Sequence, residues 1–508
     1  MNRKLQTLRN IAANWSGMIV NIIVGFALAP FILHRLGDVA FGLYALAFSF
    51  TGYYGLLDFG IRSSVIRYVA RFNATGESDQ FNRLVNTGLA SYSALALVIL
   101  AATVALSARA AALFHVPASY AATTGALFVV VGTGVALGLP LMVFGSVLEG
   151  LQRFVYLNAV QVAGTTVRAV LIVLALTHGY GVLALAVITV GVNLLSCVPY
   201  VVAVVRQTPV LFGFRWISRD TLKTIISYGS VTFMCSIAQR FRFETDAIVI
   251  GTVLSVASIT YFSIASKLTD YSTGLVQYLA QVLTPLSSEV DATGSIDQLR
   301  ALVVAGNRAC ALVALPLGAG MIILGRPLIA AWVGPRYLSS YTVLVILVAV
   351  RTLYVSQAAS TTVAFGMDRH RPLAFALLAE GLANLVLSIV LAHRWGILGV
   401  ALGTSIPMMG TTLLFLPLFI CRLVEMPLRK FLAETYVAPI LLCIPLALAL
   451  ALYRHLYPAL GYMNLAGGMA VAAVVYGAAF GWWFLTMDSL GKALRARMAS
   501  YFARTPLG

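Results

Sequence analysis

The sequence predicts an all-α, polytopic membrane protein. Hydrophobic residues make up 60% of the 508 residues, and charged residues only 10%, against roughly 25% in soluble domains. The mean hydropathy is +0.92. Apolar runs of about 20 residues, each long enough to cross a bilayer as a helix, recur along the chain. Backbone groups in lipid must be satisfied within the segment, so these runs predict helices, whereas a barrel would show short alternating strands.

We expect about fourteen transmembrane helices, with ends uncertain by a few residues. The expected spans are 11–33, 41–66, 84–108, 121–148, 157–177, 181–205, 225–250, 260–286, 301–324, 340–365, 372–392, 397–420, 436–455 and 463–486.

Several classes of protein are excluded. The net charge of +17 is typical of nucleic-acid-binding proteins, but those carry their basic residues on a water-soluble surface. The chain is also too apolar to be disordered. It contains neither the G-x-x-x-x-G-K-[ST] pattern of a P-loop nor an H-E-x-x-H zinc motif. We therefore expect no nucleic-acid partner, no metal site, no cofactor and no enzymatic activity.

The basic residues predict the orientation. If the N-terminus is cytoplasmic, 22 of the 34 Lys and Arg residues fall in inside segments, 6 in outside segments and 6 within spans. This bias follows the positive-inside rule and predicts that both termini are cytoplasmic.

Two stretches of the chain resemble each other. Gly-Leu-Gln-Arg at 150–153 matches Gly-Met-Asp-Arg at 366–369, and His-Gly-Tyr-Gly-Val-Leu at 178–183 matches His-Arg-Trp-Gly-Ile-Leu at 393–398. The repeat spans six helices, an even number, so both halves enter the membrane from the same side. Such halves are related by a pseudo-two-fold axis along the membrane normal, with a substrate site expected between them.

The repeat divides the chain into an N-lobe at 1–205, a cytoplasmic linker at 206–224 and a C-lobe at 225–420. Residues 421–508 hold two further helices and a cytoplasmic tail. Two six-helix lobes are typical of an alternating-access carrier.

Polar residues follow helical faces within three spans. In 260–286, one face holds Lys267, Asp270, Gln277 and Gln281. Their spacings of three, seven and four residues follow the period of an α-helix. Such a stripe lines a cavity or packs helices together, and we favour the cavity here.

Shorter polar stripes occur near the N-terminus, where the cavity and packing interpretations stay open. Asn14 and Asn21 lie in the first span, and Asp58 and Arg62 in the second.

Six basic residues fall within spans. Arg240 and Arg242 each have an acid four residues later, Glu244 and Asp246. Two interpretations stay open: each pair neutralises itself, or the cations line the cavity. Arg168, Arg308 and Arg351 have no acid three or four residues away. They need a partner on another helix or an anion in a water-filled cavity.

Short motifs carry a family resemblance. Residues 30–37 (Pro-Phe-Ile-Leu-His-Arg-Leu-Gly), 41–44 (Phe-Gly-Leu-Tyr), 57–60 (Leu-Asp-Phe-Gly) and 67–68 (Arg-Tyr) are followed in the second half by 246–251 (Asp-Ala-Ile-Val-Ile-Gly). The pattern resembles the polysaccharide transporter family of Wzx-like O-antigen flippases. That family belongs to the superfamily that includes the MATE multidrug exporters.

The resemblance implies a flippase that moves undecaprenyl-pyrophosphate-linked oligosaccharide, an O-antigen or exopolysaccharide repeat unit, from the inner to the outer leaflet of a bacterial inner membrane. It implies a cationic cavity for the diphosphate, lined in this chain by Arg62, Arg168, Arg240, Lys267 and Arg351. Polar residues would complete the lining: Asn14, Asn21, Asp58, Asp270, Gln277 and Gln281. Besides this glycan and membrane lipids, a glycan polymerase and a chain-length regulator are candidate partners. The coupling ion, H⁺ or Na⁺, is left open.

Two other functions compete with this one. A MATE-type, ion-coupled exporter of drugs or small molecules shares the scaffold, but often uses an acid in the first helix, and 11–33 has none. A membrane glycan polymerase or ligase would carry a large extracytoplasmic loop, which the spacing of the spans does not allow.

Overall fold

The computed structural model describes residues 3–54, 58–281, 283–292, 295–369 and 371–486, with some side chains inside these ranges excepted. All the described secondary structure is helical, as the sequence predicts. Nine described helices are long and apolar enough to cross a membrane, or up to ten if the bent pair α13–α14 is one span. Exposed Leu97, Val104 and Leu448 are typical of helices that face lipid. The protein is therefore an all-α polytopic membrane protein.

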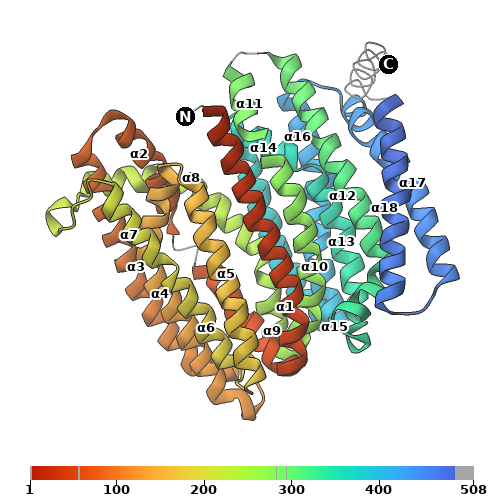
Figure 1. Cartoon of the computed structure of the whole chain (residues 1–508), viewed down its shortest axis with the longest axis horizontal. Helices are drawn as coiled ribbons and strands as arrows, with labels where there is room; N and C mark the ends of the chain where they lie inside the picture. Colours follow the sequence, from red (N-terminus) through yellow and green to blue (C-terminus); the bar gives the residue numbers. More distant parts are fainter. Residues whose placement is uncertain (1–2, 55–57, 282, 293–294, 370, 487–508) are drawn as a thin grey trace, which may run out of the picture. The chain divides into compact units, whose positions relative to one another are not determined.

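Contacts group the chain into two compact units, 1–264 with 371–407, and 265–370 with 408–508. The expected lobe boundaries stay a prediction. The first unit holds α1 to α9, the start of α10 and most of α15, and the second holds the remainder (Figure 1).

The helices of the first unit are α1 (Arg3–Tyr54), α2 (Ile61–Thr75), α3 (Ser78–Leu113), α4 (Ala121–Gly150), α5 (Phe154–Thr177), α6 (Val182–Leu195), α7 (Cys197–Gln207), α8 (Arg219–Phe243) and α9 (Thr245–Val253). Two helices extend across the division, α10 (Val256–Gln281) and α15 (Arg371–Gly410). The second unit adds α11 (Leu283–Ala292), α12 (Ile296–Trp332), α13 (Ser340–Ser356), α14 (Ala358–Gly366), α16 (Leu416–Leu423), α17 (Leu428–Leu456) and α18 (Tyr462–Thr486). Short 3₁₀ turns lie at Ala118–Tyr120, Phe214–Trp216 and Pro335–Tyr337, and a π-helical turn at Thr411–Phe415.

Glycines at positive φ explain why two helices are longer than a bilayer requires. Gly37 in α1 has φ 76° and Gly396 in α15 has φ 57°, and the helix bends at each. An L-residue with a side chain rarely adopts these angles. Each of these helices therefore contains two of the expected spans, or most of them.

The expected span 41–66 is not one helix. Its first part is the end of α1, and its last part is α2, which begins only at Ile61. Phe59 and Gly60, just before α2, have positive φ angles of 47° and 74°. Two successive left-handed residues cannot continue a right-handed helix.

The two Gly-x-x-Arg sequences end their helices in the same way. Gln152 and Asp368, at matching positions of the two Gly-x-x-Arg sequences, have φ angles of 58° and 56°. The Arg153 N–H donates to the Leu148 carbonyl and the Arg369 N–H to the Ala364 carbonyl, each at 2.9 Å. The same turn, with the same hydrogen bonds, thus ends α4 and α14.

Small residues let the helices of the first unit pack closely. A Cβ atom on Gly132 of α4 would overlap the side chain of Thr103 on α3. Further along the same two helices, buried Val85, Ile99 and Val143 form part of an apolar core. Lipid gives helices little hydrophobic reason to associate, so such close van der Waals packing holds them together.

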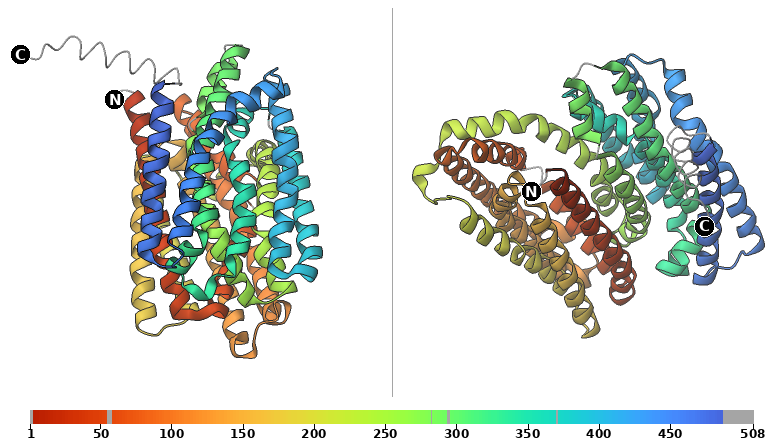
Figure 2. Two further views of the ribbon diagram at one scale, coloured as in Figure 1. Left: turned by 90° about the vertical axis from the view of Figure 1, so that its right-hand side faces the viewer. Right: turned by 45° about the horizontal axis from the view of Figure 1, so that its top comes forward.

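In the second unit, α12, α17 and α18 pack side by side (Figure 2). Leu324 of α12 and Leu446 and Leu450 of α17 are buried together. The Tyr476 hydroxyl of α18 donates to the Leu312 carbonyl at 2.5 Å. The two helices beyond the repeat are thereby attached to α12.

Candidate functional site

The residues expected to line a cavity lie in both units, and each unit is described by itself. Arg62, Arg168 and Arg240 lie in the first unit, and Lys267 and Arg351 in the second. Of the expected polar residues, the first unit holds Asn14, Asn21 and Asp58, and the second Asp270, Gln277 and Gln281. The Asn14 side chain lies outside the described part of the structure.

Asp58 and Arg62 form one polar cluster at the start of α2. Asp58 Oδ1 accepts a hydrogen bond from the Arg62 backbone N–H at 3.1 Å and another from the hydroxyl of buried Tyr92. The Arg62 guanidinium forms an ion pair with Glu149 at 2.5 Å, and its side chain is 48% exposed. The carboxylate thus holds the beginning of α2 against α3, and Arg62 is already neutralised by α4.

Asn21 joins α1 to α5. Its Oδ1 accepts a hydrogen bond from the Thr165 hydroxyl at 2.9 Å, and its own amide donates to the Gly17 carbonyl at 2.9 Å. These bonds support helix packing for this residue, one of the two interpretations that the sequence leaves open.

Arg168 differs from the other cations of the first unit. Its Nη1 lies 3.5 Å from Asn193 Oδ1 on α6, at the outer limit of a hydrogen bond. Within the described part of the chain, no carboxylate lies within ion-pair distance of this guanidinium. A partly exposed cation within a span, with only a distant amide as partner, can receive an anion.

The charges around the α8–α9 junction form two pairs. Arg240 and Glu244 lie 3.0 Å apart and are both partly exposed, as the i,i+4 spacing predicts. Arg242 also reaches Glu380 on α15, and both side chains are almost completely buried, at 2% and 1% exposure. The sequence does not predict this second pairing, because the two residues are far apart along the chain.

Further polar groups surround the buried pair. Asp246 of α9 accepts a hydrogen bond from the Thr404 hydroxyl at 2.8 Å, and the Asn384 amide donates to the Arg242 carbonyl at 3.1 Å. All of these groups belong to the first unit. The cluster therefore ties α8 and α9 to α15.

In the second unit, Arg351 of α13 finds its partner on α10. The guanidinium pairs with Asp270 and also donates to Thr269 Oγ1 at 3.2 Å. Arg351 is 3% exposed, whereas the Asp270 side chain is 56% exposed. Arg351 thus has a partner on another helix, as expected for a basic residue with no acid three or four residues away along its own helix.

The polar stripe of α10 ends with the helix at Gln281. Lys267 and Gln277 are partly buried and Gln281 is exposed, while Val276 and Ala280 on another face are buried. The alternation of polar and buried apolar positions matches the helical period predicted from the sequence. Asp270 is the member of the stripe that binds a neighbouring cation.

Arg308, the remaining basic residue in a span, is satisfied by backbone. Its Nε donates to the Glu434 carbonyl at 2.7 Å. Four of the six basic residues, Arg240, Arg242, Arg308 and Arg351, thus have a short contact with an acid or a carbonyl. Arg168 lacks one among the described residues and becomes the leading anion candidate.

Comparison with known proteins places this architecture in a family. A family model described as "Polysaccharide biosynthesis protein" matches residues 32–342, more than half of the chain. The uncharacterized membrane protein EpsK of Bacillus subtilis (strain 168) is 20% identical over 429 residues, covering 82% of this chain and 83% of EpsK.

Solved structures show the same fold. The lipid II flippase MurJ in an inward closed conformation has a TM-score of 0.73 at 14% identity, covering 93% of this chain and 98% of MurJ. An inward-facing MATE-family multidrug transporter has a TM-score of 0.63 at 18% identity, covering 84% of this chain and 96% of that chain. The match of the family model to more than half of the chain shows that the chain belongs to the polysaccharide biosynthesis protein family.

Proposed function

We propose that the protein is an alternating-access flippase. It moves a polyprenyl-diphosphate-linked oligosaccharide, carried in bacteria on undecaprenyl pyrophosphate, from the inner to the outer leaflet of the inner membrane. The family is one of polysaccharide biosynthesis, and the fold resembles a protein that flips lipid II. Both support a transporter of lipid-linked precursors. The proposal itself includes no chemical step and no cofactor.

The observation that carries the proposal is the state of Arg168. Most cations within spans are matched by a carboxylate or a carbonyl, whereas the Arg168 guanidinium has one amide oxygen at 3.5 Å. A diphosphate supplies charged acceptor oxygens that an arginine binds with two parallel hydrogen bonds. A substrate anion would therefore satisfy a charge that the protein itself leaves available.

The other expected cavity residues differ in whether their polar groups are available to the substrate. Lys267, Asp270, Gln277 and Gln281 present polar groups along α10 that suit the sugar hydroxyls. Arg62, Arg240 and Arg351 are each held by an acid. Each of these arginines would bind phosphate only if the substrate replaced its acid partner. The three therefore stay weaker candidates.

Translocation of a fluorescent polyprenyl-diphosphate disaccharide in proteoliposomes tests the function, with accessibility to a membrane-impermeant quencher as the readout. A hydrogen bond to a charged group contributes about 1.5–3 kcal/mol, so Arg168→Glu is expected to slow translocation by about tenfold or more. Arg168→Lys should retain part of the rate. The matched control is Arg109→Glu, at an exposed arginine near the end of α3.

Two results would contradict the proposal. Wild-type protein that leaves the disaccharide lipid in its original leaflet is not this flippase. Equal rates for wild type and Arg168→Glu would remove the anion site from Arg168. Export of a cationic dye by the wild type, with no movement of the lipid, would favour the MATE-type exporter.

Imposed H⁺ or Na⁺ gradients in the same vesicles would identify the coupling ion.

A further inference from the structure

A small polar pocket lies at one end of the first unit, where the ends of α2, α4, α5 and α7 meet. Its volume is about 340 Å³, within the range of small-molecule sites. It is lined by Asn73 of α2, by Leu151 and Arg153 of the α4–α5 turn, and by Gln207 of α7. A group that fills this space would therefore meet one guanidinium and two amides.

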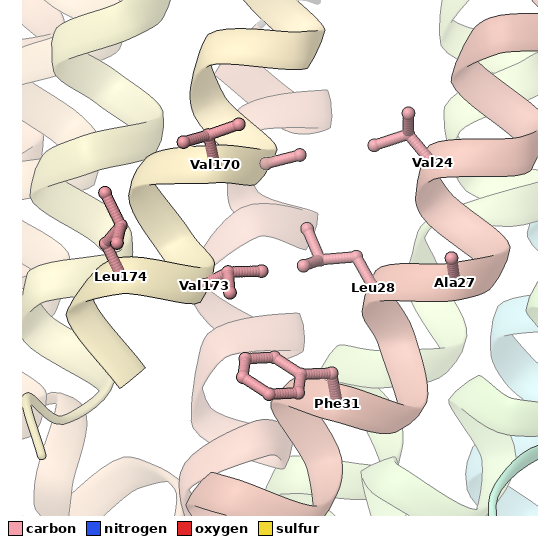
Figure 3. Close-up of a pocket in the computed structure, with 8 residues that line it drawn as sticks. Val24, Ala27, Leu28, Phe31, Val170, Val173 and Leu174 are labelled. Carbon is pink, nitrogen blue, oxygen red and sulfur yellow. The ribbon is translucent and has the colours of Figure 1, made fainter. Parts of the chain in front are cut away.

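The first unit also has an apolar groove, between α1 and α5, with a very different lining. Val24 and Phe31 of α1 face Val170 and Leu174 of α5 across it (Figure 3). Every side chain that lines this groove is hydrocarbon, so none offers a charge or a hydrogen bond that would select a ligand. The polar pocket offers both.

Packing between α2 and α4 fixes one wall of the pocket. A Cβ atom on Gly150, the last residue of α4, would lie only 2.8 Å from the Ile66 carbonyl oxygen, so the two helices touch there. The Val69 side chain also approaches Gly150, and Asn73 follows Val69 by four residues, on the same face of α2. Asn73 is thus directed to the end of α4, where Leu151 begins the turn.

The turn between α4 and α5 places Arg153. Gln152 has a positive φ of 58°, which ends α4, and the Arg153 N–H donates to the Leu148 carbonyl at 2.9 Å. The Leu157 N–H in turn donates to the Arg153 carbonyl at 3.1 Å. Both backbone groups of Arg153 are therefore fixed at the junction of the two helices, and its side chain lines the pocket.

Two tyrosines hold α7 against α5 and so position Gln207. The Tyr156 hydroxyl donates to the Pro199 carbonyl at 2.9 Å, and the Tyr200 hydroxyl donates to the Leu157 carbonyl at 3.3 Å. Gln207 follows Tyr200 by seven residues and therefore lies on the same face of α7. The packing that joins these helices thus also brings the lining residues together.

The three polar side chains of the pocket are available to a ligand. Among the residues that the structure describes, Arg153, Asn73 and Gln207 have no side-chain hydrogen bond and no ion pair. Glu149, the acid nearest to Arg153 along the chain, pairs with Arg62 at 2.5 Å. The charge of Arg153 therefore favours an anion in the pocket. A phosphate group accepts hydrogen bonds from both guanidinium and amide N–H groups.

The pocket lies where three candidate membrane spans begin or end, at Gly150, Phe154 and Gln207. The middle one, α5, has 24 residues and is about 36 Å long. This length exceeds the ~30 Å hydrocarbon core of a bilayer but not the bilayer with its headgroups. The beginning of α5, beside Arg153, therefore lies at the level of the lipid phosphate groups.

We propose that this pocket binds the phosphate group of an anionic phospholipid, with Arg153 on the phosphate and the two amides on the headgroup oxygens. A phosphate ester dissolved in water offers the same chemistry and is the other source. The site is separate from Arg168, which lies about 22 Å further along the axis of α5, beyond the reach of one diphosphate. The inference goes beyond the proposed function, because this lipid stays in its leaflet whether or not a glycan lipid is moved.

Photo-crosslinking of the full-length protein in nanodiscs tests the site. The probe is a phosphatidylglycerol with a diazirine at the first carbons of one acyl chain, and peptide mass spectrometry locates the label. A phosphatidylcholine with the same diazirine is the comparison, since its choline neutralises the phosphate. Arg153→Gln removes the cation. Arg369→Gln is the matched control, because Arg369 is exposed and follows the same left-handed turn at the end of α14, but does not line the pocket.

We expect phosphatidylglycerol to label the ends of α2, α4 and α7 around the pocket, and phosphatidylcholine to label them several-fold less. Arg153→Gln should lower the labelling about tenfold, as the loss of a hydrogen bond between charged groups would, and Arg369→Gln should leave it unchanged. Asn73→Leu, which nearly keeps the side-chain size, should lower it about two- to fivefold. Equal labelling in wild type and Arg153→Gln, or by both lipids, would overturn the proposal.

Competition with glycerol phosphate separates the two sources of phosphate. We expect the labelling to persist, because lipid headgroups are held at a high local concentration beside the pocket. Loss of the label on addition of the ester would overturn the lipid source and assign a soluble phosphate ester instead. Thermal unfolding should be the same for wild type, Arg153→Gln and Arg369→Gln, so that a lost label reports binding and not misfolding.

Discussion

The guanidinium of Arg242 on α8 pairs with the carboxylate of Glu380 on α15, and both side chains are almost completely buried. Asn384, one turn further along α15, donates to the carbonyl of the same arginine at 3.1 Å. Two contacts with Arg242, one to its guanidinium and one to its backbone carbonyl, therefore join these helices. An ion pair this deep costs much desolvation, and removing one partner leaves the other uncompensated.

Glu380→Gln is therefore expected to destabilise the protein by about 3–5 kcal/mol, the range for breaking a buried ion pair. Thermal unfolding of the purified protein in detergent, followed by intrinsic tryptophan fluorescence, measures the change. The double variant Arg242→Met with Glu380→Leu should recover part of the loss, since it removes both charges of the pair while Asp246 stays buried nearby. A double variant as unstable as Glu380→Gln would show that the charges themselves do not set the stability.

The partly exposed pair gives the contrasting case. Arg240 and Glu244 are 39% and 33% exposed at their side chains and lie 3.0 Å apart. Solvent screens such a pair, so Glu244→Gln should cost less than about 1 kcal/mol. The same unfolding measurement applies. A loss equal to that of Glu380→Gln would contradict the assignment of the two pairs to different environments.

The hydroxyl of Tyr92 is expected to hold the beginning of α2. It donates to Asp58, which also accepts the Arg62 N–H at 3.1 Å. Tyr92→Phe should destabilise the protein by about 1–3 kcal/mol, because a buried acceptor loses its partner. Ser91→Ala, beside it on α3, is the control. If the Tyr92 hydroxyl acts through the Asp58 carboxylate, Tyr92→Phe should cost little more in an Asp58→Asn background. If the stability losses of Tyr92→Phe and Asp58→Asn simply add, the two residues act independently.

Close packing at Gly132 makes a steric prediction. A Cβ atom there would overlap Thr103, whereas Gly191 has open space around its Cβ position. Gly132→Ala should lower the stability by about 1–3 kcal/mol through overpacking, while Gly191→Ala should not. Adding Thr103→Ala to Gly132→Ala should restore part of the loss. Failure of this rescue would place the cost of Gly132→Ala elsewhere than in the α3–α4 contact.

Much of the fold follows from the sequence because the bilayer imposes it. Apolar runs of membrane-spanning length can only be helices. Each of the fourteen expected spans overlaps a described helix, although 41–66 is broken before α2 and nine described helices, or up to ten, are long and apolar enough to cross a membrane. The internal repeat is predicted from matching residues in the two halves of the sequence. The break before α2 was not predicted, because Leu-Asp-Phe-Gly is apolar enough to continue a span and only the backbone angles of Phe59 and Gly60 reveal the turn.

By itself, the sequence determined the class, the helices and the identity of the charged residues within them. Spacing along one helix also predicted the pair of Arg240 and Glu244. The tertiary structure decided which cations keep their charge available, because Glu149, Glu380 and Asp270 neutralise partners on other helices. Such partners are far apart in sequence, and their pairing depends on how helices pack. Arg168 stands out only after these pairings are known.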